Sequence, residues 1–178
     1  MQPEFESVFD ELEALRNEYF KTPEFNGEIY RRKVPDKWSI EEVLYHCYLL
    51  LKYTRMASEV YLPAGRLGLK LSCSRPKIYN DYMNNIYAGD EPMPAPRMLI
   101  PKVNNDYSKG ELRLMLEQET SKMKKLVSKL SKDEAYWITY PDLVPRYPNV
   151  VQTVKLLKIH EAHHYNVLIK RERNGENN

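Results

Sequence analysis

The sequence predicts an all-α protein, a four-helix bundle in which a long crossover joins the second and third helices. Prolines cluster at residues 92–101 and 141–148, and four proline-free stretches long enough for helices lie outside those clusters. A proline inside a helix costs about 3 kcal/mol or more, so helices are expected in these stretches. Apolar residues recur at helical spacing in all four, and no convincing strand alternation appears. Four amphipathic helices with one long connection are typical of a bundle.

The first two helices precede the crossover. The first is expected over roughly residues 4–21, and the second opens at Ser39, where an S-x-x-E pair with Glu42 predicts a capping box. The second helix is expected to end near Tyr61. The apolar stripes are Phe5, Val8, Phe9, Leu12, Leu15 and Tyr19 in the first helix and Ile40, Val43, Leu44, Cys47 and Leu51 in the second.

The last two helices follow the crossover. Ser108 and Glu111 form a second S-x-x-E pair, which predicts a third helix from Ser108 to about Leu130. The fourth is expected to begin near Asn149 and to fray into the final "RERNGENN". The segments "SKDEAYW" and "PKIYNDYMNNIY" are each expected to add a short helical turn. The apolar stripes are Leu112, Leu116, Met123, Leu126 and Leu130 in the third helix and Val150, Val154, Leu157 and Leu168 in the fourth.

The crossover of about 45 residues is rich in tyrosine and proline. Connections of that length in a compact domain are usually functional or cover a surface. Two interpretations are open: the crossover caps a site, or it is an Ω-like loop that covers one end of the bundle. The chain's 14 tyrosines fit either an aromatic-lined pocket or packing with hydroxyls at the surface.

Length and composition favour one soluble domain over residues 1–178, large enough to bury about 70% of its unfolded surface without a metal or disulfide. With 27 basic and 25 acidic residues the net charge is +2, which predicts neither a nucleic-acid nor a membrane partner. Two cysteines, Cys47 and Cys73, make no disulfide framework, so a reduced, cytoplasmic setting is expected. The acidic N-terminus is unlike a signal peptide, and the longest apolar run, "CYLLL", is too short to span a membrane.

Three of the chain's 4 histidines fall within "HEAHH", residues 160–164, in the pattern H-E-x-x-H. On a helix this pattern is typical of zinc proteases, in which the two histidines bind zinc and the glutamate is the general base. His160 and His164 differ by about 40° around a helix, whereas His163 lies about 100° from His164 and is expected outside the same site. A protease of this type needs a third ligand further along the chain, but only "YNVLIKRERNGENN" follows. The protease interpretation is therefore rejected.

The remaining histidine, His46, lies on the flank of the apolar face of the second helix. A helical bundle can bring this helix beside the fourth, and with it His46 beside His160 and His164. Three neutral imidazoles that leave coordination positions open make a catalytic type of site for zinc or a similar divalent metal. Spacing alone leaves a second interpretation, in which the three histidines form a hydrogen-bonded cluster in the core.

The order of several short motifs resembles the DinB/YfiT-like superfamily of metalloenzymes. They are Trp38 with the capping box after it, His46 in "EVLYH", the proline-rich "YPDLVPRYP" and the final "LLKIHEAHHYNVL". One departure is "RYPNVVQT", which lacks the glycine that relatives often carry before the last helix. Members of the superfamily are four-helix bundles with a tri-histidine metal site and are commonly dimers. The resemblance implies that His46, His160 and His164 bind one divalent metal ion (zinc, nickel or iron) and that the protein is a homodimer.

Two glutamates are expected near this site. Glu161 is directed inward and is the best local acid–base candidate, but a structural role is favoured, in which it orients a ligand imidazole or pairs with a basic side chain. Glu119 interrupts the apolar stripe of the third helix. It is a reserve ligand or a hydrogen-bond partner for a histidine, unless a slight rotation of the helix places it on the surface, which is the preferred interpretation.

The resemblance also implies a class of chemistry. Characterised relatives include enzymes that use low-molecular-weight thiols, among them S-transferases and a thiol-dependent isomerase. A metal-dependent enzyme similar to a thiol S-transferase is therefore expected, acting on a small electrophilic substrate. Two alternatives stay open. One is a metal-dependent hydrolase that activates water at the same ligands, and the other is a non-enzymatic, stress-associated binding protein in which the histidines are structural.

Overall fold

Helices make up the regular structure of the described part of the chain, which comprises residues 2–72, 76, 78–88, 94–104, 106–142 and 146–174. In this computed structural model the described residues form five α-helices, two short 3₁₀ helices and no strand. The elements are α1 (Pro3–Tyr19), η1 (Pro23–Asn26), α2 (Ile40–Leu71), η2 (Arg97–Leu99), α3 (Lys109–Val127), α4 (Lys132–Trp137) and α5 (Val150–Asn174). The all-α prediction is confirmed. Cys73, Pro92 and Pro145 lie outside the described residues.

The helix starts follow the capping signals in the sequence. Ser39 accepts a hydrogen bond from the backbone N–H of Glu42, whose carboxylate accepts one from the backbone N–H of Ser39. The serine–glutamate pairs that begin α3 and α4 have the same reciprocal geometry. These bonds satisfy N–H groups that a helix start leaves unpaired. The predicted starts of the second and third helices and the short helix in "SKDEAYW" are therefore confirmed.

α2 is longer than the sequence predicts. The sequence predicts that this helix ends near Tyr61, but α2 continues through Pro63 to Leu71. Pro63 lacks the N–H that would bond the carbonyl of Glu59, and both residues are exposed, so water can replace the missing donor. Leu62 and Leu69 are buried, about 100–120° around the helix from Pro63, and their packing keeps the last turns helical. The crossover is correspondingly shorter.

The crossover also contains less helix than expected. The sequence predicts a helical turn in "PKIYNDYMNNIY", but the described residues of that segment, 76 and 78–87, contain none. The side-chain oxygens of Asn80 and Asn85 instead accept hydrogen bonds from the backbone N–H groups of Tyr82 and Tyr87, each at 3.0 Å. Such asparagine turns compete directly with helical hydrogen bonding. The prediction of a helical turn here is wrong.

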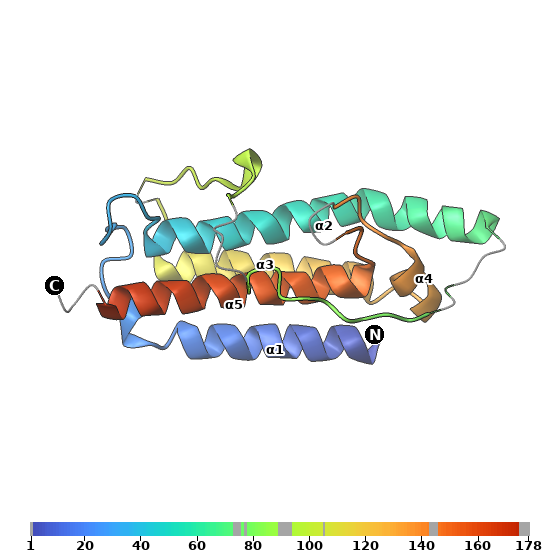
Figure 1. Ribbon diagram of the computed structural model, residues 1–178, viewed down its shortest axis with the longest axis horizontal. Coiled ribbons are helices and arrows are strands. Elements are labelled where there is room, and N and C mark those ends of the chain that lie inside the picture. Colours follow the sequence, from blue (N-terminus) through green and yellow to red (C-terminus); the bar gives the residue numbers. More distant parts are fainter. Residues whose placement is uncertain are drawn as a thin grey trace.

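Four long helices lie side by side (Figure 1). α2 contacts α3 and α5, and α1 contacts the same two helices. α2 and α3 run in the same direction, and α1 and α5 run in the opposite one. The first turns of α2 therefore lie at the same end of the molecule as the last turns of α5, which brings together the helices that carry the histidines.

The space between these helices is filled by apolar side chains. The largest fully buried ones include Phe5, Phe25, Leu44, Leu112 and Tyr165, contributed by four different helices and by η1. Burial of each such side chain is worth about 1.5–3 kcal/mol, so we expect the core to form without a metal ion. No helix among the described residues is apolar over a length that could cross a membrane.

Candidate metal centre

His46, His160 and His164 lie together where α2 packs against α5. The Nε2 atom of His46 is 3.0 Å from Nε2 of His160, and Nε2 of His164 is 3.2 Å from the same atom. One nitrogen from each ring lies within 4.8 Å of the other two. The helical phase that places His160 beside His164 is thus confirmed, and so is the position of His46 beside them.

These separations fit a shared metal ion. Nitrogen ligands at about 2.0–2.1 Å from a metal are about 2.9 Å apart at right angles and about 3.4 Å apart at tetrahedral angles. The observed 3.0 and 3.2 Å lie between those limits. Hydrogen bonding alone satisfies the cluster less well, because the single Nε2 of His160 can donate one proton to one neighbour only. The donor set and its spacing therefore suit a divalent metal.

A backbone carbonyl fixes the ring of His46. Its Nδ1 lies 2.7 Å from the carbonyl oxygen of Leu99, in η2, and because that oxygen can only accept, Nδ1 carries the proton. Nε2 then presents its lone pair to the cluster. The ring of Trp38 packs against the imidazole, with centroids 4.9 Å apart. Metal-bound histidines are commonly oriented by such a hydrogen bond from the other ring nitrogen.

Burial keeps the three imidazoles neutral. Desolvation lowers the pKa of His46, although the bond to the Leu99 carbonyl raises it slightly in return. Desolvation, followed by repulsion from the neighbouring histidines, lowers the pKa of His160 further. The same two causes lower the pKa of His164 to about 3. Neutral imidazoles are the form that binds metal, so at neutral pH no proton has to leave before an ion enters.

His163 takes no part in the cluster. Its ring stacks on Tyr87 of the crossover, with centroids 4.5 Å apart and ring planes at 19°. Tyr87 also meets the edge of His160, with centroids 5.6 Å apart. The crossover therefore covers this side of the histidines, in agreement with the interpretation that it caps a site. Burial raises the pKa of Tyr87 to about 12, so its hydroxyl is neutral.

Glu161 belongs to a buried ion pair. Its carboxylate oxygens accept hydrogen bonds from Nε and Nη2 of Arg16 in α1, at 2.7 and 2.9 Å. The Tyr165 hydroxyl donates to the same carboxylate, and Nη1 of Arg16 donates to Thr120 of α3 at 2.8 Å. Burial lowers the pKa of Arg16, but the charge and hydrogen bonds of Glu161 outweigh it and raise that pKa. Of the two structural roles predicted for Glu161, the structure shows the ion pair with a basic side chain.

Glu119 is neither a ligand nor a surface residue. Its side chain is buried and bonds to Arg55 at 2.9 Å and to Lys122 at 2.6 Å. Burial would raise the pKa of this carboxyl, but the hydrogen bonds from Lys122 and Arg55 prevail and lower it. The preferred placement on the surface is therefore wrong. Arg55, a helical turn beyond Leu51, supplies the partner that allows the charge to be buried.

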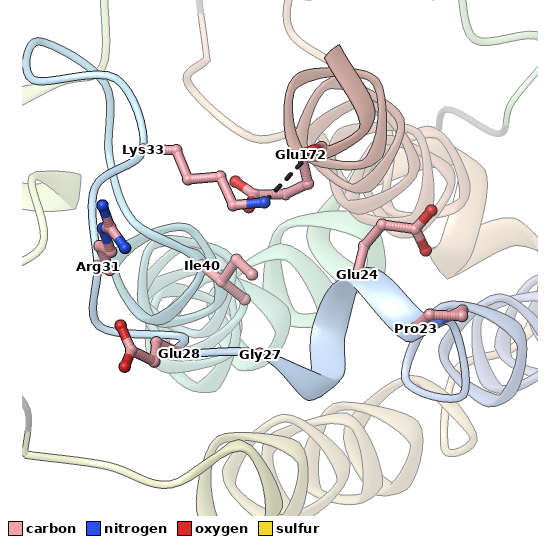
Figure 2. Close-up of a pocket in the computed structure, with 8 residues that line it drawn as sticks. All are labelled: Pro23, Glu24, Gly27, Glu28, Arg31, Lys33, Ile40 and Glu172. Carbon is pink, nitrogen blue, oxygen red and sulfur yellow. Dashed lines mark hydrogen bonds and ion pairs between the residues drawn. The ribbon is translucent and has the colours of Figure 1, made fainter. Parts of the chain in front are cut away.

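A cavity of about 330 Å³ lies near the start of α2 and the end of α5 (Figure 2). Lys33 reaches across it to Glu172, with Nζ 3.2 Å from Oε2. Its lining mixes both charges and contains no histidine: Pro23, Glu24, Gly27, Glu28, Arg31, Lys33, Ile40 and Glu172. The three-histidine group that could hold a metal ion therefore contributes no residue to the lining of this cavity.

Sequence reasoning missed three residues of this region. Arg16 lies one turn beyond Leu12 on the apolar stripe of α1, a position that signals an inward charge needing a partner. Tyr87 is one of many tyrosines and carries no distinguishing signal. The backbone carbonyl of Leu99 gives no signal in the sequence either, because every residue carries such a group.

No family model, curated protein or solved structure matches this chain. The resemblance to the DinB/YfiT-like superfamily therefore remains a prediction from the motifs quoted above, whereas the three-histidine geometry is observed in the structure.

Proposed function

We propose that the four long helices form a four-helix bundle of the DinB/YfiT type, and that His46, His160 and His164 hold one divalent metal ion at an open catalytic site. The observation that carries the proposal is the convergence of three neutral ring nitrogens from two helices on one point. Three protein ligands leave room for a substrate atom, as catalytic sites do and closed structural sites do not. The bound ion would act as a Lewis acid for the thiol or water that fills the remaining position.

The reaction we propose is transfer of a low-molecular-weight thiol to a small electrophilic substrate. Glu161 supports this over hydrolysis, because its carboxylate is held by Arg16 and Tyr165 and is not available as a general base. No carboxylate shares the three-histidine cluster among the described residues. A thiol loses its proton far more readily than water does, so it needs less help from a base.

The chain's own thiol in this region does not supply the nucleophile. Cys47 follows His46 in α2 but is buried, and burial, reinforced by the charge of Glu161, raises its pKa well above the usual range. A neutral buried thiol is a poor nucleophile. The reacting sulfur would therefore enter with a second substrate.

The other residues around the histidines orient them and restrict water. The Leu99 carbonyl holds the tautomer of His46 that presents Nε2. Trp38 and Tyr87 cover the imidazoles on two sides. An environment of this kind strengthens electrostatic interactions within the site, because less water screens them.

Metal analysis of protein purified without chelator tests the site directly. One equivalent of a divalent ion is expected per chain, and His46→Ala, His160→Ala and His164→Ala should each abolish stoichiometric binding. His163→Ala is the matched control, since it removes an imidazole from the same helix and should leave binding intact. Equal loss of metal in His163→Ala and His160→Ala would contradict the ligand assignment.

Cobalt-substituted protein distinguishes the two reaction classes. Addition of 2-mercaptoethanol should produce a sulfur-to-cobalt charge-transfer band, because the open position would take the thiolate. Cobalt protein whose spectrum is unchanged by thiol, but which hydrolyses activated esters, would favour the hydrolase instead. Protein that binds no divalent ion at all would leave the histidines with a structural role.

A further inference from the structure

A short segment of the crossover lies against the histidines of α5. This strap, residues 80–88, runs from the side of α4 along α5 and is green in Figure 1. Near its far end the ring of Tyr87 stacks on His163, with centroids 4.5 Å apart, and meets the edge of His160 at 5.6 Å. His46 and His160 are themselves only 3% and 4% exposed. A ligand that approaches the cluster from this side must therefore displace the strap.

The residue just before the strap is anchored on α4. The Tyr79 hydroxyl donates a hydrogen bond to Asp133 at 2.6 Å, and its ring meets the ring of Tyr136 edge-on, with centroids 5.2 Å apart. The ammonium group of Lys132 lies 4.7 Å from the centre of the same ring. Edge-on ring pairs and cations over rings are both attractive. Several contacts of different kinds thus fix the start of the strap.

The strap itself is held more weakly, by polar contacts along one face of α5. They are the Lys155–Asp81 ion pair at 2.5 Å, the bond from Gln152 to the carbonyl of Tyr82 at 2.9 Å, and the bond from Asn149 to the carbonyl of Asn80 at 2.8 Å. The side chains of Lys155 and Asp81 are 26% and 47% exposed, and exposed ion pairs add little stability. No residue of the strap is buried. A segment without buried apolar side chains opens at low cost in free energy.

We propose that the strap is a lid, which leaves α5 to admit ligands to the metal centre and returns to exclude water from it. The proposal rests on the metal site proposed above and adds how access to that site is controlled. Tyr79 is the fixed end, the three polar contacts are the latch, and Tyr87 is the cover over His160. The latch joins the strap to the first turns of α5 and not to the ligand histidines. It therefore sets how often the lid opens, and not how tightly the ion is held.

Stopped-flow rates of zinc entry into the metal-free protein, and of zinc extraction by excess chelator, test the lid. Lys155→Met should speed both by about two- to fivefold, the effect of losing an exposed ion pair, and should leave the dissociation constant unchanged. Lys158→Met is the matched control: Lys158 pairs with Glu11 of α1, also at 2.5 Å, and its replacement should change neither rate. Equal acceleration by the two variants would overturn the proposal, as would a changed dissociation constant in Lys155→Met.

Further variants separate a moving strap from a static cover. Lys155→Asp places two like charges in the latch and should speed both rates more, and adding Asp81→Lys should restore the wild-type rates. Tyr87→Ala should speed both at least tenfold, whereas Tyr87→Phe keeps the stacked ring and should not. Acceleration by Tyr87→Ala alone, with unchanged rates in the latch variants, would refute movement of the strap.

Modification of the metal-free protein by diethyl pyrocarbonate gives a measurement that needs no metal. This reagent acylates neutral imidazoles, so mass spectrometry of the modified peptides reports how often His160 is uncovered. Its modification should be faster in Lys155→Met than in the wild type, and unchanged in Lys158→Met. A chain that shows this pattern but binds no ion would refute the proposed function and support the lid. One equivalent of metal, with His160 equally protected in all variants, would refute the lid alone.

Discussion

Replacing Glu161 by glutamine should destabilise the fold and spare the metal. Two hydrogen bonds, at 2.7 and 2.9 Å, join this carboxylate to Arg16, and the two side chains are 5% and 3% exposed. Glutamine keeps one acceptor oxygen but turns an NH₂ group toward a guanidinium that can only donate. The Arg16 cation is then buried without a counter-charge.

The expected loss is about 3–5 kcal/mol, the usual cost of removing one partner from a buried ion pair. For a chain of this length each kcal/mol lowers the melting temperature by about 2–4 °C, which predicts a fall of about 6–20 °C. Arg16→Met should cost a similar amount. The double variant should lose clearly less than the sum of the two, because neither charge is left unpaired.

Differential scanning calorimetry of the wild type, the two single variants and the double variant measures this double-mutant cycle. Metal analysis at a temperature well below the unfolding transition provides the second measurement. One equivalent of metal is expected in Glu161→Gln, since the carboxylate contacts Arg16 and Tyr165 and no histidine nitrogen. A stable Glu161→Gln protein with full metal and a rate reduced about a thousandfold would refute the reasoning, because that is the effect of losing a general base.

Three other predictions concern the core and the histidines. Chelation should lower the melting temperature but retain helical circular dichroism, since the apolar core forms without metal; loss of helicity would show a structural metal. The chelated protein should be most stable above about pH 6.5 and should lose stability as the pH falls towards 3. The reason is that burial, and then repulsion from His46 and His163, lowers the pKa of His164 from 6.5 to about 3 in the folded protein, so unfolding takes up a proton in this pH range. Denaturant midpoints that do not fall between pH 6.5 and about 5 would contradict this prediction. Gly65→Ala should lower the free energy of unfolding in urea by about 1–3 kcal/mol, because the new Cβ would lie 2.6 Å from Cγ1 of Ile138. Gly110→Ala is the matched control: its Cβ would have open space, so the free energy of unfolding should rise by about 0.4–1 kcal/mol.

The parts of the fold that depend on neighbouring residues could be predicted from sequence. The starts of α2 and α3 follow from serine–glutamate pairs three residues apart, whose bonds are local. The end of α2 could not be predicted in this way. Pro63 is a local signal against helix, and the burial of Leu62 and Leu69 against distant parts of the chain overrides it.

The same division holds at the site. The angular spacing around one helix was enough to predict that His160 and His164 share a site and that His163 lies outside it, because this spacing is a local property. The partners of the glutamates were harder to predict, since Arg16 precedes Glu161 by 145 residues. A carboxylate on an apolar stripe indicates that a basic side chain pairs with it, but the local sequence does not identify that side chain. Only packing of α1 against α5 makes the choice.

The hydrogen bond from His46 to the carbonyl of Leu99 has a consequence for genetics. Every residue type carries that oxygen, so no substitution at position 99 deletes the contact itself. A mutational scan would score this position by how well a side chain fills the space of a buried leucine. The control of the histidine's tautomer would escape the scan. Evolution can likewise exchange the crossover's side chains there and leave the proton on Nδ1.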